Sequence, residues 1–135
     1  MFDTKIAIVI RDDLETWQKL NVTAFLVSGV IGQAPEIMGK PYRDREGNAF
    51  NPLCIQPMIV LAADGDLLSR IHQRALGREV RTSAYVEEMF ATGHDAANRE
   101  VFAKFGPEDA KIVGLSLRAD KKIVDKITKG AKMHA

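Results

Sequence analysis

The sequence predicts an α/β protein with a largely parallel sheet, and two observations carry this prediction. Four short apolar runs rich in β-branched residues recur along the 135 residues, as expected of strands buried inside a sheet. Segments between these runs carry apolar residues at intervals of three and four, which is the spacing of amphipathic helices. Strands separated by helices favour βαβ connections, and hence parallel pairing.

The first strand is expected at Ile6–Ile10, followed by a charged turn at residues 11–13. Asp12 with Glu15 three residues later resembles a capping box, so a helix should begin here. Its apolar stripe is expected to consist of Leu14, Trp17, Leu20, Ala24, Val27 and Ile31. The second half of this helix is apolar on its other face too, which predicts that the sheet and a further structure enclose it. Gly29 and Gly32 would weaken that end or let another backbone approach closely.

Residues 35–57 differ from the rest of the chain, because four of the five prolines lie in them. Tyr42 to Asn48 is typical of a strand that enters a turn, with Gly47 supplying a positive φ. We interpret the segment as a hairpin excursion that lies over the domain. It is either a lid or binding loop, or plain cover for the apolar half of the first helix.

The rest of the chain continues the alternation. A strand is expected at Met58–Ala63, followed by a helix that Asp64 caps and Gly77 ends. The later elements are a strand at Val80–Val86, helical pieces around Tyr85–Ala91 and Asp95–Lys104, a strand at Ile112–Leu117, and a helix from Asp120 to Gly130. Because no linker or internal repeat interrupts this order, residues 1–135 are predicted to form a single domain.

Composition limits the classes of function. Hydrophobic residues at 46% and charged residues at 27% exclude a disordered chain, and a formal net charge of +1 gives no general attraction to nucleic acid or anionic membranes. The single cysteine, Cys54, excludes an internal disulfide and suits a reducing compartment. The first residues lack the pattern of a signal peptide, and no apolar run is long enough to span a bilayer, so we expect a cytoplasmic protein.

Two stretches resemble the type-II peptidyl-tRNA hydrolases. One is Lys5 to Leu14, which opens a long helix, and the other is Lys111 to Leu117, which precedes a short helix. The fuller pattern resembles, over nearly the whole chain, a bacterial family described as domain of unknown function two thousand. It consists of Arg11-Asp12-Asp13-Leu14, then Trp17 to Val22, then Gly39-Lys40-Pro41-Tyr42. The resemblance implies a peptidyl-tRNA hydrolase II-like fold: a three-layer α/β/α sandwich around a four-stranded mixed sheet, with the last strand antiparallel. The hydrolases lack the hairpin excursion at 35–57, which is expected in addition to this fold.

The resemblance does not extend to the reaction. The hydrolases carry a lysine, a glutamine and a histidine along one face of the first helix. The matching positions here are Asn21, Phe25 and Ser28, and the acidic residue expected after the third strand falls near Tyr85, two residues before Glu87. A shift of the alignment by one residue does not recover the set, so we do not expect hydrolysis of peptidyl-tRNA.

Ligands of open α/β sheets bind beyond the carboxyl ends of the parallel strands. Arg11, Asp13, Tyr85 and Glu87 should gather there, together with aspartates 64 and 66. The plain alternative is that the aspartates cap helices while Arg11 pairs with one of them.

The first helix adds a second group of candidates, with Phe25 between Asn21 and Ser28. They predict an apolar cleft with two hydrogen-bonding points, or else polar groups that the hairpin satisfies. The apolar part of a ligand would contact Phe25, with Tyr42 closing over it; alternatively, Phe25 belongs to the core. The candidate ligand-binding residues are Arg11, Asp13, Asn21, Phe25, Ser28, Tyr42, Tyr85 and Glu87.

Other reactive residues give weaker signals. Histidines 72, 94 and 134 share no ligand spacing with each other or with Cys54, so the sequence predicts neither a metal site nor a cofactor. We expect His94 with Asp95 to cap a helix, and Cys54 to be a buried thiol rather than a nucleophile. The lysines at 121, 122, 126, 129 and 132 favour solubility over a phosphate-binding strip, so no strong nucleic-acid binding and no membrane binding are expected.

Three functions stay open at this point. The first is a cytoplasmic protein that binds a small ligand at the strand ends under the hairpin. The second is a hydrolase of peptidyl-tRNA, or of a smaller ester or amide, that uses a relocated set such as Lys19, Asp13 and Glu87. The third is a structural or interaction module, with a possible homodimer formed through an apolar surface.

Overall fold

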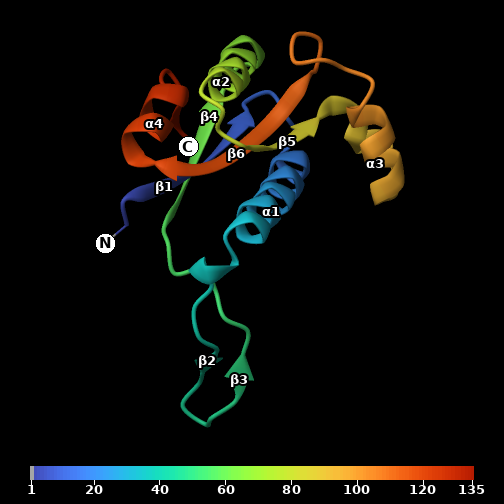
Figure 1. The fold of residues 1–135 in the computed structure, drawn as a ribbon. Helices are drawn as coiled ribbons and strands as arrows, with labels where there is room; N and C mark the ends of the chain where they lie inside the picture. The colour runs from blue at the N-terminus through green and yellow to red at the C-terminus, as the bar shows by residue number, and fades with distance from the viewer. Residues whose placement is uncertain (1) are drawn as a thin grey trace.

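A computed structural model describes residues 2–135 and contains a mixed five-stranded sheet of order β5-β6-β1-β4-β7 (Figure 1). The central strand β1 (Thr4–Arg11) pairs parallel with β4 (Met58–Ala63) and antiparallel with β6 (Ile112–Asp120). The edge strands β5 (Ser83–Val86) and β7 (Lys132–Met133) are both antiparallel to their neighbours. The α/β class and the antiparallel fourth strand are therefore confirmed. The predictions of four strands and of a largely parallel sheet are wrong, because three of the four strand pairings are antiparallel.

The fifth strand was missed because it is very short. β7 pairs Met133 with Leu61 and Lys132 with Ala62, and the His134 N–H donates to the Val60 carbonyl oxygen at 3.0 Å. Two residues are too few to show the alternation by which a strand is recognised in a sequence.

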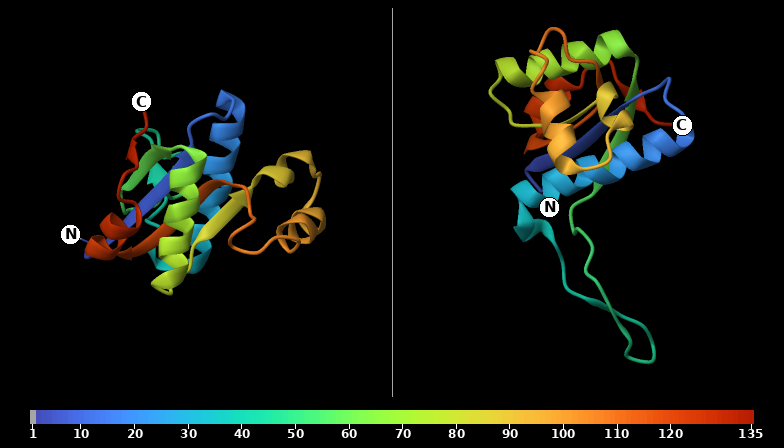
Figure 2. Two further views of the ribbon diagram at one scale, coloured as in Figure 1. Left: turned by 90° about the horizontal axis from the view of Figure 1, so that it is seen from above. Right: turned by 90° about the vertical axis from the view of Figure 1, so that its right-hand side faces the viewer.

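Helices cover both faces of the sheet (Figure 2). The long helix α1 (Thr16–Gln33) packs on one face, and α2 (Gly65–Gly77) with α4 (Lys121–Ile127) packs on the other. The strand β1 supplies side chains to both faces, so its centre is a continuous apolar run. Its residues exposed by at most 1% are Ile6, Ala7, Ile8, Val9 and Ile10.

The start of α1 differs from the prediction. The helix begins at Thr16, and the backbone N–H of Glu15 donates to the side-chain oxygen of Gln18 at 3.0 Å. The predicted capping box of Asp12 and Glu15 is therefore wrong. The N–H of Asp12 instead donates to the Ala63 carbonyl oxygen at 2.9 Å, which keeps this residue in the turn beside β4.

The buried face of α1 also differs from the prediction. The helix buries Val22, Leu26 and Val30, whereas Trp17 and Leu20 of the predicted stripe are 60% and 68% exposed. Because α1 is apolar around most of its circumference, spacing alone does not identify the face that meets the sheet. The expectation that its second half is enclosed on both sides is wrong as well.

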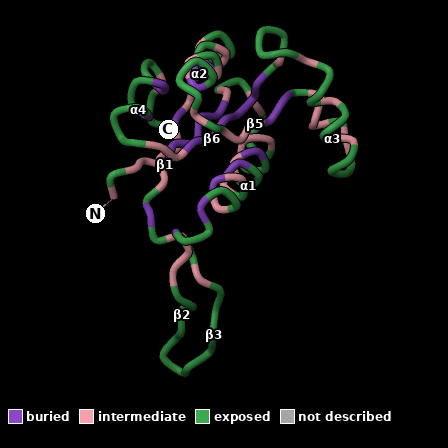
Figure 3. The backbone as a smooth tube through the Cα atoms, viewed as in Figure 1, coloured by how far each residue is buried: buried purple, intermediate pink, exposed green. Residues whose placement is uncertain are grey.

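Residues 38–55 form an arm that extends away from the domain (Figures 1 and 3). The short helix η1 (Pro35–Ile37) leads into it, and β2 (Tyr42–Arg43) pairs antiparallel with β3 (Ala49–Phe50) near its tip. Gly47 has a φ of 86°, so the predicted hairpin turn is confirmed. The interpretation as a layer over the domain, whether lid or cover, is wrong, because every residue from 40 to 51 is exposed.

Two further elements follow β5, namely the helical turn η2 (Glu87–Ala91) and the helix α3 (Asp95–Phe102), which lies beyond the edge of the sheet (Figure 1). The predicted caps of the later helices are confirmed. The Asp64 side chain accepts from the N–H of Leu67 at 2.8 Å, and Asp120 and His94 cap α4 and α3 in the same way. None of the helices in residues 2–135 combines the length and the apolar character needed to cross a bilayer.

Candidate functional site

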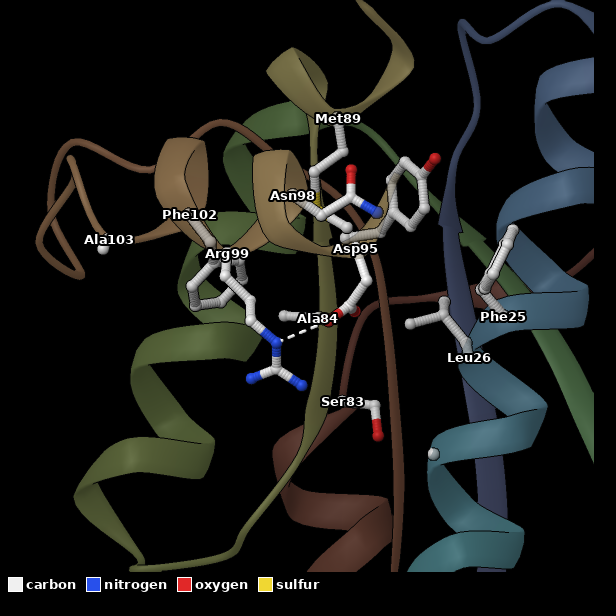
Figure 4. Close-up of a pocket in the computed structure, with 12 residues that line it drawn as sticks. Phe25, Leu26, Ser83, Ala84, Met89, Asp95, Asn98, Arg99, Phe102 and Ala103 are labelled. Carbon is white, nitrogen blue, oxygen red and sulfur yellow. Dashed lines mark hydrogen bonds and ion pairs between the residues drawn. The ribbon is translucent and has the colours of Figure 1, made fainter. Parts of the chain in front are cut away.

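A groove lies between α1, β5 and α3 (Figure 4). Its central cavity has a volume of about 640 Å³ and is bordered by Phe25 of α1, Tyr85 of β5, and Asn98 and Phe102 of α3. Smaller cavities of about 300 Å³ and 360 Å³ share lining residues with it and extend it in two directions. We call the three together the α1–α3 groove.

Aromatic rings dominate one end of the α1–α3 groove. The ring centroids of Trp17 and Phe90 are 5.9 Å apart, those of Phe90 and Tyr85 are 5.3 Å apart, and those of Tyr85 and Phe25 are 6.2 Å apart. These separations are typical of favourable aromatic packing. Tyr85 is 7% exposed and forms the floor, whereas Trp17 and Phe25 are 60% and 56% exposed. Two ring surfaces are therefore open to solvent beside a cavity.

Amide groups from both walls complement the rings. Asn21 of α1 and Asn98 of α3 line the same part of the α1–α3 groove, and Asn98 points from α3 into the space before α1 (Figure 4). The Thr92 hydroxyl contacts the Asn98 side chain and lies 2.8 Å from the Met89 carbonyl oxygen, which fixes the amide in place. An amide both donates and accepts hydrogen bonds, so these two side chains can recognise the polar edge of a ligand.

Two charged residues of the α3 wall neutralise each other, whereas Arg81 lines the cavity of about 360 Å³. The Asp95 carboxylate and the Arg99 guanidinium of α3 are 2.6 Å apart. The hydrogen bond from Arg99 to Asp95 raises the pKa of the guanidinium above its ordinary value. The pair leaves this wall without net charge.

The narrowest part of the α1–α3 groove depends on Gly29. A Cβ atom at this position would lie 2.0 Å from the Ser83 side-chain oxygen, so only glycine lets α1 approach the edge strand β5 this closely. The close backbone approach expected for this glycine is confirmed.

A separate cluster of charges joins the ends of β1 and β5. The Arg11 guanidinium contacts Asp13 at 2.6 Å and Glu87 at 3.0 Å. Burial opposes the charge on Arg11, but the hydrogen bonds to Asp13 and Glu87 outweigh it and raise the pKa of Arg11 above its ordinary value. The plain alternative, in which the aspartates cap helices while Arg11 pairs with one of them, is confirmed for Asp64 and for the Arg11–Asp13 pair and is wrong for Asp12.

The eight candidate residues therefore fall into separate places. Asn21, Phe25 and Tyr85 line the α1–α3 groove, whereas Arg11, Asp13 and Glu87 form the ion cluster. The Ser28 hydroxyl donates to the Phe25 carbonyl oxygen of its own helix at 2.5 Å. Tyr42 is on the arm and 54% exposed, so the expectation that it closes over a ligand beside Phe25 is wrong.

Sequence reasoning missed Trp17, Phe90 and Asn98 as site residues. For Trp17 a signal existed, because Trp17, Asn21 and Phe25 are spaced by four and share one helix face. No comparable signal places η2 and α3 opposite α1, since the path of the preceding loop decides their position.

Other chemistry is limited to a few groups. Among residues 2–135, no cluster of three or more histidine, cysteine, aspartate or glutamate side chains is placed to hold a metal ion. The Cys54 thiol is partly buried at the base of the arm and donates to the Gln56 carbonyl oxygen at 3.4 Å. This cysteine lines a cavity with Val27 and Ile31 of α1 and is not among the residues that line the α1–α3 groove.

These features define an α/β protein with an open aromatic groove outside one edge of its sheet. The chain belongs to a family described as proteins of unknown function, DUF2000, whose pattern matches residues 4–135. The family resemblance noted in the sequence is thus confirmed. The chain is also similar to the solved structure of Atu0240, a protein of unknown function from Agrobacterium tumefaciens strain C58. The identity is 67%, the match covers 100% of both chains and the TM-score is 0.99. No curated protein matches the chain.

Proposed function

We propose that this protein binds a small molecule through the α1–α3 groove, which accepts a flat apolar or aromatic group. The observation that carries the proposal is the pair of open rings, since Trp17 and Phe25 are more than half exposed beside a cavity of about 640 Å³. Small-molecule sites are mostly apolar clefts of about 300–1,000 Å³ with a few placed polar groups.

The lining indicates the kind of ligand. A flat group would stack against Phe25 and Trp17, which extends the aromatic packing already present around Tyr85. Asn21 and Asn98 would bind a polar edge that carries both donors and acceptors. Because Asp95 and Arg99 neutralise each other, the α3 wall does not select a ligand by its net charge.

The same lining supports binding over catalysis. Burial raises the pKa of Tyr85, so its phenol stays protonated at neutral pH and acts as a donor rather than a base. His94 uses its Nδ1 atom to accept the Ala97 N–H at 3.2 Å. Asp13 and Glu87, suggested for a relocated hydrolase set, are both held by Arg11.

We extend the proposal to the fold type, the location and the oligomeric state of the protein. Helices on both faces of a sheet with a central β1 support a three-layer α/β/α sandwich of the type-II peptidyl-tRNA hydrolase kind. The single cysteine supports a cytoplasmic location. The protein acts as a homodimer in which each α1–α3 groove is complete within one protomer.

Trp17 is the only tryptophan of the chain, so its fluorescence reports occupation of the groove directly. Titration with indole-free flat probes, such as 1-anilinonaphthalene-8-sulfonate and adenosine, should change its emission in a saturable way for at least one probe. Phe25→Ala should weaken that binding by about tenfold to a hundredfold, because stacking on a ring this size contributes ~1–3 kcal/mol.

Leu20→Ala is the matched control, since Leu20 is a 68% exposed residue of α1 outside the groove lining. It should leave the affinity unchanged. Trp17 emission that responds to neither probe, or equal losses in the two variants, would contradict the proposed function.

A further inference from the structure

Hydrogen bonds within the tip of the arm hold its shape, although no other described segment lies beside it (Figure 1). The Asp44 side chain accepts hydrogen bonds of 2.9 Å from the backbone N–H of Glu46, the backbone N–H of Asn48 and the Asn48 amide. Arg43 donates to the Gly47 carbonyl oxygen at 3.1 Å. An isolated two-stranded hairpin is only marginally stable in water. A hairpin whose tip carries its own hydrogen bonds is therefore suited to contact with another molecule.

The arm also carries exposed apolar side chains. Tyr42 and Phe50 are paired across the two strands, so they share one face of the hairpin, and they are 54% and 57% exposed. Leu53 and Ile55, nearer the base, are 62% and 58% exposed. Single exposed apolar residues are ordinary, but four on one short arm, two at its tip and two near its base, indicate an interaction surface.

The receiving surface for such side chains lies at the base of the same arm. An apolar cavity of about 400 Å³ is bordered there by Val27 and Ile31 of α1 and by Met38, Leu53 and Met58. Tyr42 follows Met38 by four residues, which in an extended strand is about 13 Å. We call this the base cavity.

We propose that the arm binds the arm of a second copy of this chain. The two arms lie antiparallel about a two-fold axis through their middle, so that Tyr42 and Phe50 of each copy enter the base cavity of the other. A two-fold axis makes every contact reciprocal. Because the tip and the base cavity are at opposite ends of one arm, a single axis satisfies both contacts.

The exposed area is adequate for a dimer. An aromatic side chain offers about 150–250 Å², so four large apolar side chains that are more than half exposed offer ~400 Å² on each arm. For both copies these side chains supply ~800 Å², and the exposed polar side chains and backbone of residues 40–51 add to it, toward the ~1,200–2,000 Å² of a stable interface. Charge does not oppose the pairing, because three basic and two acidic residues alternate along residues 40–46.

Light scattering and sedimentation velocity on the full chain test this dimer. Wild-type protein should have a mass of about 30 kDa, twice 14.9 kDa, at ~10–100 µM. Tyr42→Lys with Phe50→Lys should give a monomer of 14.9 kDa. The matched control, Ala49→Lys with Asn51→Lys, adds the same charge to the other face of the same strand and should stay dimeric.

Mixing supplies a second readout. Ile31→Lys in the base cavity should also give a monomer, and mixing it with the Tyr42→Lys, Phe50→Lys variant should restore a heterodimer with one intact contact. Circular dichroism and groove-probe binding confirm folding of each variant. A monomeric wild type, a dimer that survives the tip substitutions, or equal dissociation by the two lysine pairs would overturn the inference, and none of these results bears on the groove.

Discussion

At the scale of single residues, Phe25 and Leu26 are neighbours on α1 with opposite roles. Phe25 is 56% exposed and borders the α1–α3 groove, whereas Leu26 is 2% exposed and packs against the sheet. A side chain that stays open in the folded protein contributes little to its stability. The exposure of Phe25 therefore supports a role in binding rather than in the core.

This difference gives a prediction about stability. Leu26→Ala should lower the free energy of unfolding by about 2–5 kcal/mol, because it leaves a cavity in the core. Phe25→Ala should lower it by only about 1 kcal/mol, because less than half of the ring is buried. Urea denaturation measures both, and equal losses would place Phe25 in the core.

A second prediction concerns His72 on α2. Burial lowers the pKa of this histidine below 6.5, and its Nδ1 atom has no hydrogen-bond partner among residues 2–135. Below pH 6.5 the unfolded chain therefore binds more protons than the folded chain, so stability decreases as the pH falls through this value. His72→Gln should flatten the decrease in melting temperature between about pH 7 and 5; an unchanged slope would contradict this assignment.

At the scale of elements, the base of the arm is fastened to the sheet through Gln56. This side chain is 4% exposed; it donates to the Thr4 carbonyl oxygen at 3.2 Å and hydroxyl at 3.0 Å, and accepts from Arg118 at 2.9 Å. One amide thus links the arm to β1 and β6. The direction of the arm follows from this buried link as well as from its prolines.

Gln56→Leu should lower the free energy of unfolding by about 1–3 kcal/mol, since it leaves partly buried polar groups of β1 and β6 without the Gln56 amide. Gln33→Leu, an exposed change at the end of α1, should shift it by less than about 0.5 kcal/mol. Thermal unfolding of the pair separates the two cases. A neutral Gln56→Leu would show that water replaces the lost hydrogen bonds.

Elements with strong local signals were predicted well. For α2, the Asp64 cap and the Gly77 end were both predicted from clear end signals, and the helix between them buries a narrow stripe of Leu68, Ile71 and Ala75. For α1 the start and the buried face were predicted wrongly, because its apolar residues surround the helix. The direction of the arm could not be predicted either, since residues 40–51 pack on nothing else in the described chain.

The candidate site could be predicted only in part. Asn21 and Phe25 were found because they match positions that the resembling hydrolases use along one face of the first helix, and Tyr85 because the acidic residue of those hydrolases falls near it. Asn98 and Phe90 were missed because the groove is formed between elements far apart in the sequence. Tyr42 and Ser28 were wrongly joined to it, since periodicity shows which residues share a face but not what lies opposite.

At the scale of the whole molecule, α1 separates two surfaces. With about 100° between successive residues of a helix, Trp17, Asn21 and Phe25 lie on one flank, and Val27 and Ile31 lie on the other. The first flank borders the α1–α3 groove, and the second borders the base cavity. Ligand binding and arm pairing therefore use different sides of the same helix.

The two activities should consequently be independent. The variant with Tyr42→Lys and Phe50→Lys should bind a groove probe with an affinity within about twofold of the wild type. Titration of Trp17 fluorescence in both proteins measures this. A loss of tenfold or more would show that the second copy contributes to the groove, contrary to a site complete within one protomer.

The most direct measurement is an amide nuclear magnetic resonance titration of the ¹⁵N-labelled protein with 1-anilinonaphthalene-8-sulfonate or adenosine. We expect the resonances of the Trp17 indole N–H and of the Asn21 and Asn98 side-chain amides to shift together, with one common dissociation constant. These groups come from the two walls of the α1–α3 groove. Shifts confined to the base cavity around Leu53, or no saturable shift with either probe, would contradict a binding site between α1, β5 and α3.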